Sequence, residues 1–173
     1  RDVDLLQDLA RRRAAAVTLS LTTLDEGLAW VLEPRASRPS HRLAAIEALA
    51  KAGVPAGLLI APVLPSLTDH EMPRILRAAA DAGAAFAGCS MLRLPGAVRP
   101  IFEGWLEVQF PDRKKKVLHK LREESCAGGG VFAKTAEALF EAGRRKAGLS
   151  NRWPVLSTAS FRRPSGNQLT LNL

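Results

Sequence analysis

The sequence has little of several residue types on which particular kinds of site depend. Of its 173 residues only Cys89 and Cys126 are cysteines, and no tyrosine is present. Two cysteines fit a reducing compartment and exclude any metal site built from three or four cysteines of this chain. No run of about 18 apolar residues occurs, and the first residues lack the basic-then-apolar order of a secretory signal. These absences predict a cytoplasmic protein without a membrane partner.

What is present is typical of one folded domain. Hydrophobic residues make up 47% of the chain and charged residues 24%, close to globular averages, which argues against disorder and against a disulfide scaffold. A length of 173 residues fits about one domain. Lysine and arginine number 25 against 17 acidic residues, a net charge of +8, which would favour a phosphate-bearing partner if the charge lay on one face.

The first third of the chain predicts helix, strand and helix. Residues 2–13 have leucines on helical spacing, and we expect their apolar stripe to be buried. Residues 16–22 alternate apolar and hydroxyl side chains, the period of a strand, so that Thr18, Ser20 and Thr22 share one face. Ser40 is expected to cap a helix that Gly53 ends.

The pattern then repeats. Residues 54–61 form an almost wholly apolar run, as expected for a strand covered on both faces. Thr68 and Glu71 have the spacing of a capping box for a helix that stops at Gly83, and residues 84–91 are a third strand candidate. Strands that alternate with helices predict right-handed βαβ units and a parallel sheet. The fold class is therefore α/β.

The last part of the chain is predicted to be helical and then extended. Helices are expected over residues 102–110, 113–124 and 132–146, with a glycine loop at 128–130, and an extended or surface-bound tail from Ser150. We therefore divide the chain into a sheet-containing part (1–98), a helical C-terminal extension (99–149) and a tail (150–173). Three strands are too few for a closed barrel of about eight. An open three-stranded sheet would have two exposed edges, so we infer that further strands lie upstream of Arg1.

Candidate site residues follow from the topology, because ligands bind at the carboxyl ends of parallel strands. Hydroxyl groups there could bind a ribose or a carboxylate, a glutamate could accept from an amine, and an arginine could pair with a carboxylate. The backbone near the prolines could bind the edge of an adenine. The set suits a zwitterionic nucleoside, and its members are Ser20, Thr22, Glu33, Arg42, Pro62, Val63, Ser90 and Leu92.

The order of short motifs along the chain is similar to the second half of radical S-adenosylmethionine proteins. More narrowly, it resembles the group related to spore photoproduct lyase and often labelled DNA repair photolyase. The motifs are Leu19-Ser20-Leu21, Leu32-Glu33-Pro34-Arg35, Arg42-Leu43, Ala52-Gly53-Val54, Ile60-Ala61-Pro62-Val63-Leu64-Pro65 and Thr68-Asp69, followed by Phe102, Trp105, Gly129-Gly130, Gly148-Leu149 and Phe161-Arg162-Arg163-Pro164.

The resemblance implies the second half of a partial parallel, TIM-like (β/α)₆ barrel that binds S-adenosylmethionine on a [4Fe-4S] cluster. Such proteins cleave this cofactor reductively to a 5′-deoxyadenosyl radical, and the group implies a lyase-like enzyme. By this likeness Ser20, Thr22, Glu33 and Arg42 contact the ribose and methionine part of the cofactor. The turn 62–65 and residues 90–92 border its adenine.

The sequence departs from the family at the cluster. Three cysteines spaced CxxxCxxC hold the cluster and leave one iron open, and this motif is absent here. The cluster ligands are therefore expected outside this chain, and the expected partner is a missing N-terminal half or a reductant protein. This chain alone is expected to be inactive. We assign it no catalytic residue and no metal ligand. Cys89 is expected to be a small buried hydrophobe with a raised thiol pKa.

A second hypothesis comes from the basic clusters at residues 11–13, 113–116, 144–146 and 162–163. They are compatible with a basic non-catalytic module that contacts DNA or a partner protein. Charge runs of this kind are more often solvated helix faces, and two of these clusters close helices, where the helix dipole favours cations. Nucleic acid is accordingly kept as the alternative partner.

Overall fold

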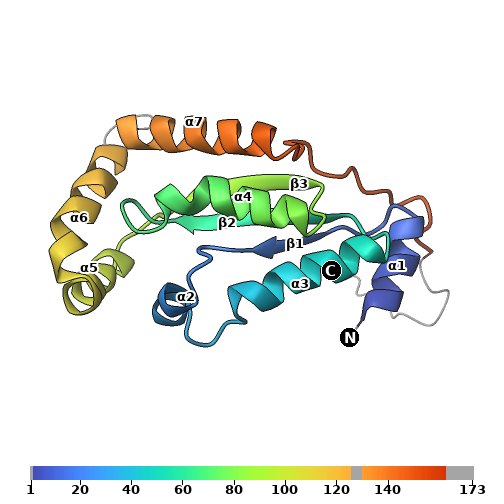
Figure 1. Ribbon diagram of the computed structural model, residues 1–173, viewed down its shortest axis with the longest axis horizontal. Coiled ribbons are helices and arrows are strands. Elements are labelled where there is room, and N and C mark those ends of the chain that lie inside the picture. Colours follow the sequence, from blue (N-terminus) through green and yellow to red (C-terminus); the bar gives the residue numbers. More distant parts are fainter. Residues whose placement is uncertain (1, 126–129, 163–173) are drawn as a thin grey trace, which may run out of the picture.

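A three-stranded parallel sheet forms the centre of the computed structural model, which describes residues 2–125 and 130–162 (Figure 1). The strands are β1 (Val17–Ser20), β2 (Ala56–Val63) and β3 (Phe86–Met91), in the order β1-β2-β3. Both neighbouring pairs are parallel, and Ser20 aligns with Leu59 and Ile60 with Cys89. The predicted α/β fold with a parallel sheet is confirmed.

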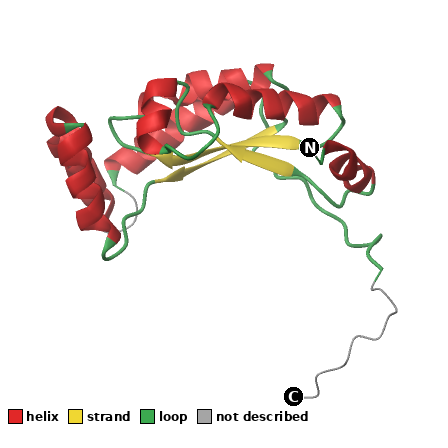
Figure 2. Ribbon diagram, turned by 90° about the horizontal axis from the view of Figure 1, so that it is seen from below, coloured by secondary structure: helices red, strands yellow, loops and turns green. Residues whose placement is uncertain are grey.

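Helices cover only one face of this sheet (Figure 2). They are α3 (Pro39–Lys51), α4 (Met72–Asp81) and α7 (Val131–Lys146), and their apolar side chains form the main core with the inward side chains of the strands. The other face carries Thr18, Ser20 and Ser90, which are exposed, and Leu59, which is partly buried. The expectation that β2 is covered on both faces holds only in part, because on this second face Gly57 is buried under the Phe86 ring whereas Leu59 is only partly buried.

The predicted helix stops at Gly53 and Gly83 are correct, whereas the predicted caps at Ser40 and Thr68 do not form. Gly53 and Gly83 have φ angles of 71° and 92°, the left-handed conformation that ends a helix. Helix α3 begins at Pro39, and the Ser40 hydroxyl donates to Glu26 instead of capping the helix. Glu71 lies in a short 3₁₀ turn, η1 (Asp69–Glu71), before α4, and its carboxylate accepts hydrogen bonds from another loop.

A helical hairpin stands at the carboxyl ends of the strands. It consists of α5 (Val98–Gln109) and α6 (Pro111–Ser125), which confirms the helices predicted in this part of the chain. A second apolar cluster fixes the hairpin to the loop after β2 and contains Leu64, Leu67, Leu106, Val117 and Leu121. The hairpin therefore forms a wall beside the end of the sheet.

The first helix, α1 (Val3–Arg11), is where we predicted it, but its apolar stripe is not buried. None of its residues is buried, Leu5 and Leu9 are exposed, and Leu6 and Ala10 only border the main core. Helix α1 lies at the amino ends of the strands (Figure 1). Leu5 and Leu9 leave one apolar edge of the helix exposed.

After α7 the chain forms a strap, residues 150–157, against the sheet. The Ser150 N–H donates to the Ala85 carbonyl, and the Ala87 N–H donates to the Ser150 carbonyl, both at 3.0 Å. The Trp153 ring packs on Phe86 with 4.9 Å between centroids. The tail was predicted to be extended or bound to the surface, and residues 150–157 lie against the body of the protein. Residues 163–173, Cys126 and the glycines at 128 and 129 lie outside the described residues.

Candidate ligand site at the carboxyl ends of the strands

The site begins with a short helix that the sequence analysis treated as loop. Helix α2 (Glu26–Leu32) starts after Asp25, whose carboxylate accepts from the Leu28 N–H at 2.8 Å. An aspartate at this position is a common N-cap, so Asp25 was the local signal for the helix. With seven residues, α2 is too short to be stable alone and depends on its surroundings.

A buried carboxylate fixes the loop between β1 and α2. The Thr23 hydroxyl donates to one oxygen of Glu71 at 2.6 Å, and the Leu24 N–H donates to the other at 3.0 Å. The side chain next to this loop, Thr22, donates to the Ala61 carbonyl at 3.2 Å. Glu71 is only 4% exposed, so these bonds are protected from water. The loop is thereby held at the end of β2.

Arg42 contacts two of the other predicted site residues, Ser20 and Glu33. Its guanidinium is 2.9 Å from a Glu33 carboxylate oxygen, and it donates to the carbonyls of Ser20 and Ser37 at 2.9 Å each. The Arg42 side chain is 11% exposed. These contacts use three of the five N–H donors of arginine. Ser20 thus joins the cluster through its backbone carbonyl, while its side chain lies on the open face of the sheet.

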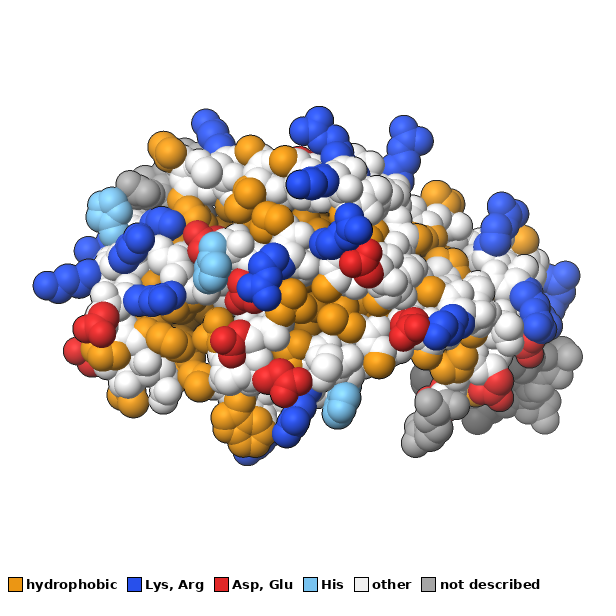
Figure 3. Space-filling model, viewed as in Figure 1, with side chains coloured by type: hydrophobic (Ala, Val, Ile, Leu, Met, Phe, Trp, Pro, Cys, Tyr) orange, Lys and Arg blue, Asp and Glu red, His pale blue; other side chains and the backbone are white. Residues whose placement is uncertain are grey.

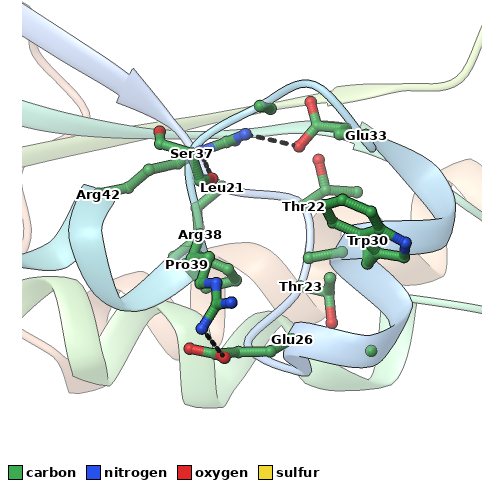
Figure 4. A pocket seen from close by; sticks show the side chains of 13 residues that line it. Leu21, Thr22, Thr23, Glu26, Trp30, Glu33, Ser37, Arg38, Pro39 and Arg42 are labelled. Carbon is green, nitrogen blue, oxygen red and sulfur yellow. Dashed lines mark hydrogen bonds and ion pairs between the residues drawn. The ribbon is translucent and has the colours of Figure 1, made fainter.

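A charged pocket lies between α2 and the start of α3 (Figure 4). Helix α2 and the residue after it provide one wall with Glu26, Trp30 and Glu33, and the other wall holds Arg38 and Arg42. The volume is about 240 Å³. Acidic groups thus face basic groups across one small space, which suits a ligand with a positive and a negative group. The lining is completed by Leu21, Thr22, Thr23, Gly27, Ala29, Ala36, Ser37 and Pro39.

An apolar groove adjoins the charged pocket and reaches the helical hairpin. Its volume is about 350 Å³. The Phe102 and Trp105 rings are stacked on one side, with 5.5 Å between centroids. Thr22 and Glu33 line both the groove and the charged pocket, so the two spaces share a border. The remaining groove residues are Leu32, Pro62, Leu64, Leu92, Val98 and Ile101.

The structure brings five of the eight candidate residues to these two spaces. They are Thr22, Glu33, Arg42, Pro62 and Leu92. Val63 is instead fully buried in the main core, because it follows a register shift in β2 and faces the helices. The Ser20 and Ser90 side chains are exposed on the open face of the sheet and line neither space.

Sequence reasoning did not assign several side chains that line the two spaces. Glu26 and Trp30 lie on α2, which was not predicted, and Arg38 lies in the loop before α3. Phe102 and Trp105 were noted in the resemblance, without a role. Their spacing of three residues was the available signal, since it places both rings on one face of a helix.

Residues 2–125 and 130–162 contain no cluster of metal-binding side chains, since no three side chains of His, Cys, Asp or Glu in them lie close enough together to hold a metal ion. Cys89 is half-buried in β3. Burial of the thiol, which is the largest cause, and the Glu137 and Glu141 carboxylates together raise its pKa to about 11. The raised pKa agrees with the sequence prediction for Cys89.

Cys89 is therefore expected to react slowly with thiol reagents. In a Cys126→Ser variant at pH 8, the folded protein should hold about 100-fold less thiolate at Cys89 than a thiol with the ordinary value of 9.0. The neutral thiol is the favoured form in the fold, so its contribution to stability is present below pH 9 and is lost between pH 9 and 11. Modification rates with and without urea measure this, and equal rates would contradict it.

Basic side chains do not gather in one patch on the face seen in Figure 3. Lysine and arginine are spread over this face and are interspersed with acidic and apolar side chains. Several are paired, as in Arg77 with Asp81 and Lys120 with Asp69. The hypothesis of a DNA-binding or protein-binding module stays a prediction.

Comparisons with known proteins give distant relatives. No family model matches the chain, and no solved structure matches it. The uncharacterized protein Rv2578c of Mycobacterium tuberculosis is 34% identical over 114 residues, which cover 65% of this chain and 34% of that protein. The uncharacterized protein ORF301 of Acidianus two-tailed virus is 27% identical over 131 residues, 72% of this chain and 43% of that protein. The chain thus spans about a third of the mycobacterial relative's length.

Among the helices in residues 2–125 and 130–162, none is both long enough and apolar enough to cross a membrane.

Proposed function

We propose that this chain is the cofactor-facing part of a radical S-adenosylmethionine protein related to spore photoproduct lyase. In this proposal the open sheet is the second half of a partial (β/α) barrel, whose preceding strands belong to a longer protein. The open outer edge of β1 and the exposed leucines of α1 support this, because unpaired strand edges are normally covered in folded proteins.

The proposal is carried by the shared border of the charged pocket and the apolar groove. S-adenosylmethionine has a zwitterionic amino-acid end, a central ribose and a planar adenine. The charged pocket offers groups of both signs to the amino-acid end, and the groove offers Pro62 and Leu92 to the adenine. Thr22 and Glu33, which line both spaces, would meet the ribose between them. Together the two spaces reach the size usual for small-molecule sites.

Each residue of this chain has a separate task in the proposal. Arg42 orients Glu33 through their ion pair and keeps two N–H donors beyond its present contacts for a ligand carboxylate. Glu33 gives Arg42 one of its two carboxylate oxygens, and the other suits a ribose hydroxyl or an ammonium group. When bound to a reduced [4Fe-4S] cluster, S-adenosylmethionine supplies a 5′-deoxyadenosyl radical. The three thiolates of such a cluster do not fit this chain, which has two cysteines, and no step is assigned to it here.

Binding of S-adenosylmethionine to the purified chain tests the proposal. We expect Arg42→Ala to weaken binding by about 10-fold or more, since a hydrogen bond to a charged group contributes about 1.5–3 kcal/mol. Arg42→Lys should keep part of the affinity. Isothermal titration calorimetry measures both, with thermal melts to show that the variants are folded. Arg77→Ala is the matched control, because Arg77 is an exposed arginine paired with Asp81 on α4, outside both spaces.

Two results would contradict the proposal. One is no measurable binding of S-adenosylmethionine by the folded chain. The other is equal loss of affinity in Arg42→Ala and Arg77→Ala. Binding of DNA that falls steeply with added salt, without binding of the adenosyl compound, would instead favour the basic module.

A further inference from the structure

Helix α2 presents an indole between two carboxylates to the charged pocket. Glu26, Trp30 and Glu33 are spaced by four and three residues, which places them on one side of the helix axis. All three line the pocket. Figure 4 shows Trp30 on the opposite side of the pocket from Arg38 and Arg42. We call these three side chains the α2 stripe.

Trp30 has none of the roles that usually fix a tryptophan. It is 68% exposed, although it lines a pocket. Its ring is not among the aromatic pairs or the cation–ring contacts found in the described part of the chain. Among aromatic side chains the indole face of tryptophan attracts a cation most strongly, and the attraction grows when the cation leaves water. The ring is therefore open to such a contact.

Each of the two carboxylates of the α2 stripe forms an ion pair with an arginine. Glu33 pairs with Arg42 at 2.9 Å, whereas Arg38 is 3.5 Å from Glu26 and mostly exposed. The acidic side of the pocket is therefore partly neutralised from the opposite wall. A cation near Trp30 gains from the ring and from both carboxylates, while an anionic group of the same ligand can replace Glu26 as the partner of Arg38.

We propose that the Trp30 indole face, between Glu26 and Glu33, is a cation subsite that binds the sulfonium group of the adenosyl ligand. This inference rests on the proposed function and goes further, because it makes the positive charge of the sulfonium a condition for tight binding. The order of side chains along the pocket matches the order of ribose, sulfonium and carboxylate in the ligand. Glu33 stands at the border where the ribose is expected, and Trp30 is one helical turn away. Arg38 and Arg42 lie across the pocket, where the carboxylate is expected.

The inference predicts discrimination between two ligands that differ by one methyl group and one charge. S-adenosylmethionine carries the sulfonium, and S-adenosylhomocysteine is the neutral thioether with the same adenine, ribose and amino-acid end. We expect Trp30→Leu to weaken binding of S-adenosylmethionine about fivefold to tenfold and to change binding of S-adenosylhomocysteine by less than about twofold. Trp30→Phe, which keeps a weaker ring, should lie between.

Two further variants separate the charge effect from loss of packing. Trp105→Leu removes an indole from the apolar groove and should weaken both ligands by the same factor, because adenine is common to them. Trp153→Phe, in the strap and outside both spaces, should change neither. Calorimetric titration of both ligands into all four variants gives the dissociation constants, and thermal melts show that the variants are folded.

Each possible result is informative. Selective loss of S-adenosylmethionine in Trp30→Leu supports the cation subsite. Equal loss of both ligands, or no loss, overturns the subsite while the binding of S-adenosylmethionine by the wild-type chain still supports the proposed function. If the wild-type chain binds neither ligand, the proposed function fails, and the subsite fails with it.

Discussion

Gly57→Ala is expected to destabilise the protein by about 3 kcal/mol, at the upper end of the usual cost of overpacking. A Cβ at Gly57 would lie 2.1 Å from Cε2 of Phe86, 2.4 Å from Cζ and 2.5 Å from Cδ2. The ring is 2% exposed and is held from its other side by Trp153. Because an aromatic ring cannot bend, either the ring or strand β2 must move. Urea unfolding measures the loss.

The control for this variant is Gly104→Ala in helix α5. Apart from the neighbouring backbone of its own helix, no described atom lies within 4 Å of a Cβ at Gly104, so the change should stabilise the helix by about 0.5–1 kcal/mol. Adding Phe86→Leu to Gly57→Ala should recover part of the lost stability. The leucine side chain is smaller and can change rotamer to avoid the new Cβ at position 57. Wild-type stability in Gly57→Ala would show that the Phe86 ring leaves its place freely.

Glu71→Ala is expected to cost about 2–4 kcal/mol. The change leaves the Thr23 hydroxyl and the Leu24 N–H without their acceptor in a place that is closed to water, and each such donor costs about 1–3 kcal/mol. Glu71→Gln should cost less, because the amide oxygen can still accept one of the two bonds. The free energy of unfolding from urea titrations measures the series.

Glu47→Ala is the matched control for Glu71. Glu47 is an exposed glutamate that pairs with Lys51 on the same helix, and its loss should change stability by no more than about 0.5 kcal/mol. The Glu71 variants should also bind S-adenosylmethionine less tightly, because the loop they loosen carries Thr22 and Thr23 into the charged pocket. A Glu71→Gln protein as stable as wild type would show that only one of the two bonds contributes.

The parallel sheet could be predicted because its signals are local. The alternation before Ser20, the apolar run of β2, and the glycines at 53 and 83 each depend on their own neighbours in sequence. The rule that ligands bind at the carboxyl ends of strands then selected Thr22, Pro62 and Leu92 from three different strand ends. In the structure these three residues line one groove.

The features that were not predicted depend on partners far away in the chain. Glu71 has the spacing of a capping box, but the donors that it accepts from are 47 and 48 residues away. Helix α2 has only seven residues, too few for a clear helical period of apolar residues. Its position depends on the preceding loop, which Glu71 holds in place. Val63 was placed at the ligand because the strand ends there. A register shift between Ile60 and Val63 instead turns it into the core, and nothing in the local sequence signals the shift.

The strap joins two segments that are distant in sequence. Ser150 is bonded beside β3, and the Ser157 N–H donates to the Arg13 carbonyl, just before β1, at 2.8 Å. Helix α1 and the strap therefore occupy the pole of the molecule opposite to α2 and α5 (Figure 1). A fluorescent label or a surface tether placed on the strap would stand clear of the ligand entrance, so immobilised protein should keep both spaces accessible to small molecules.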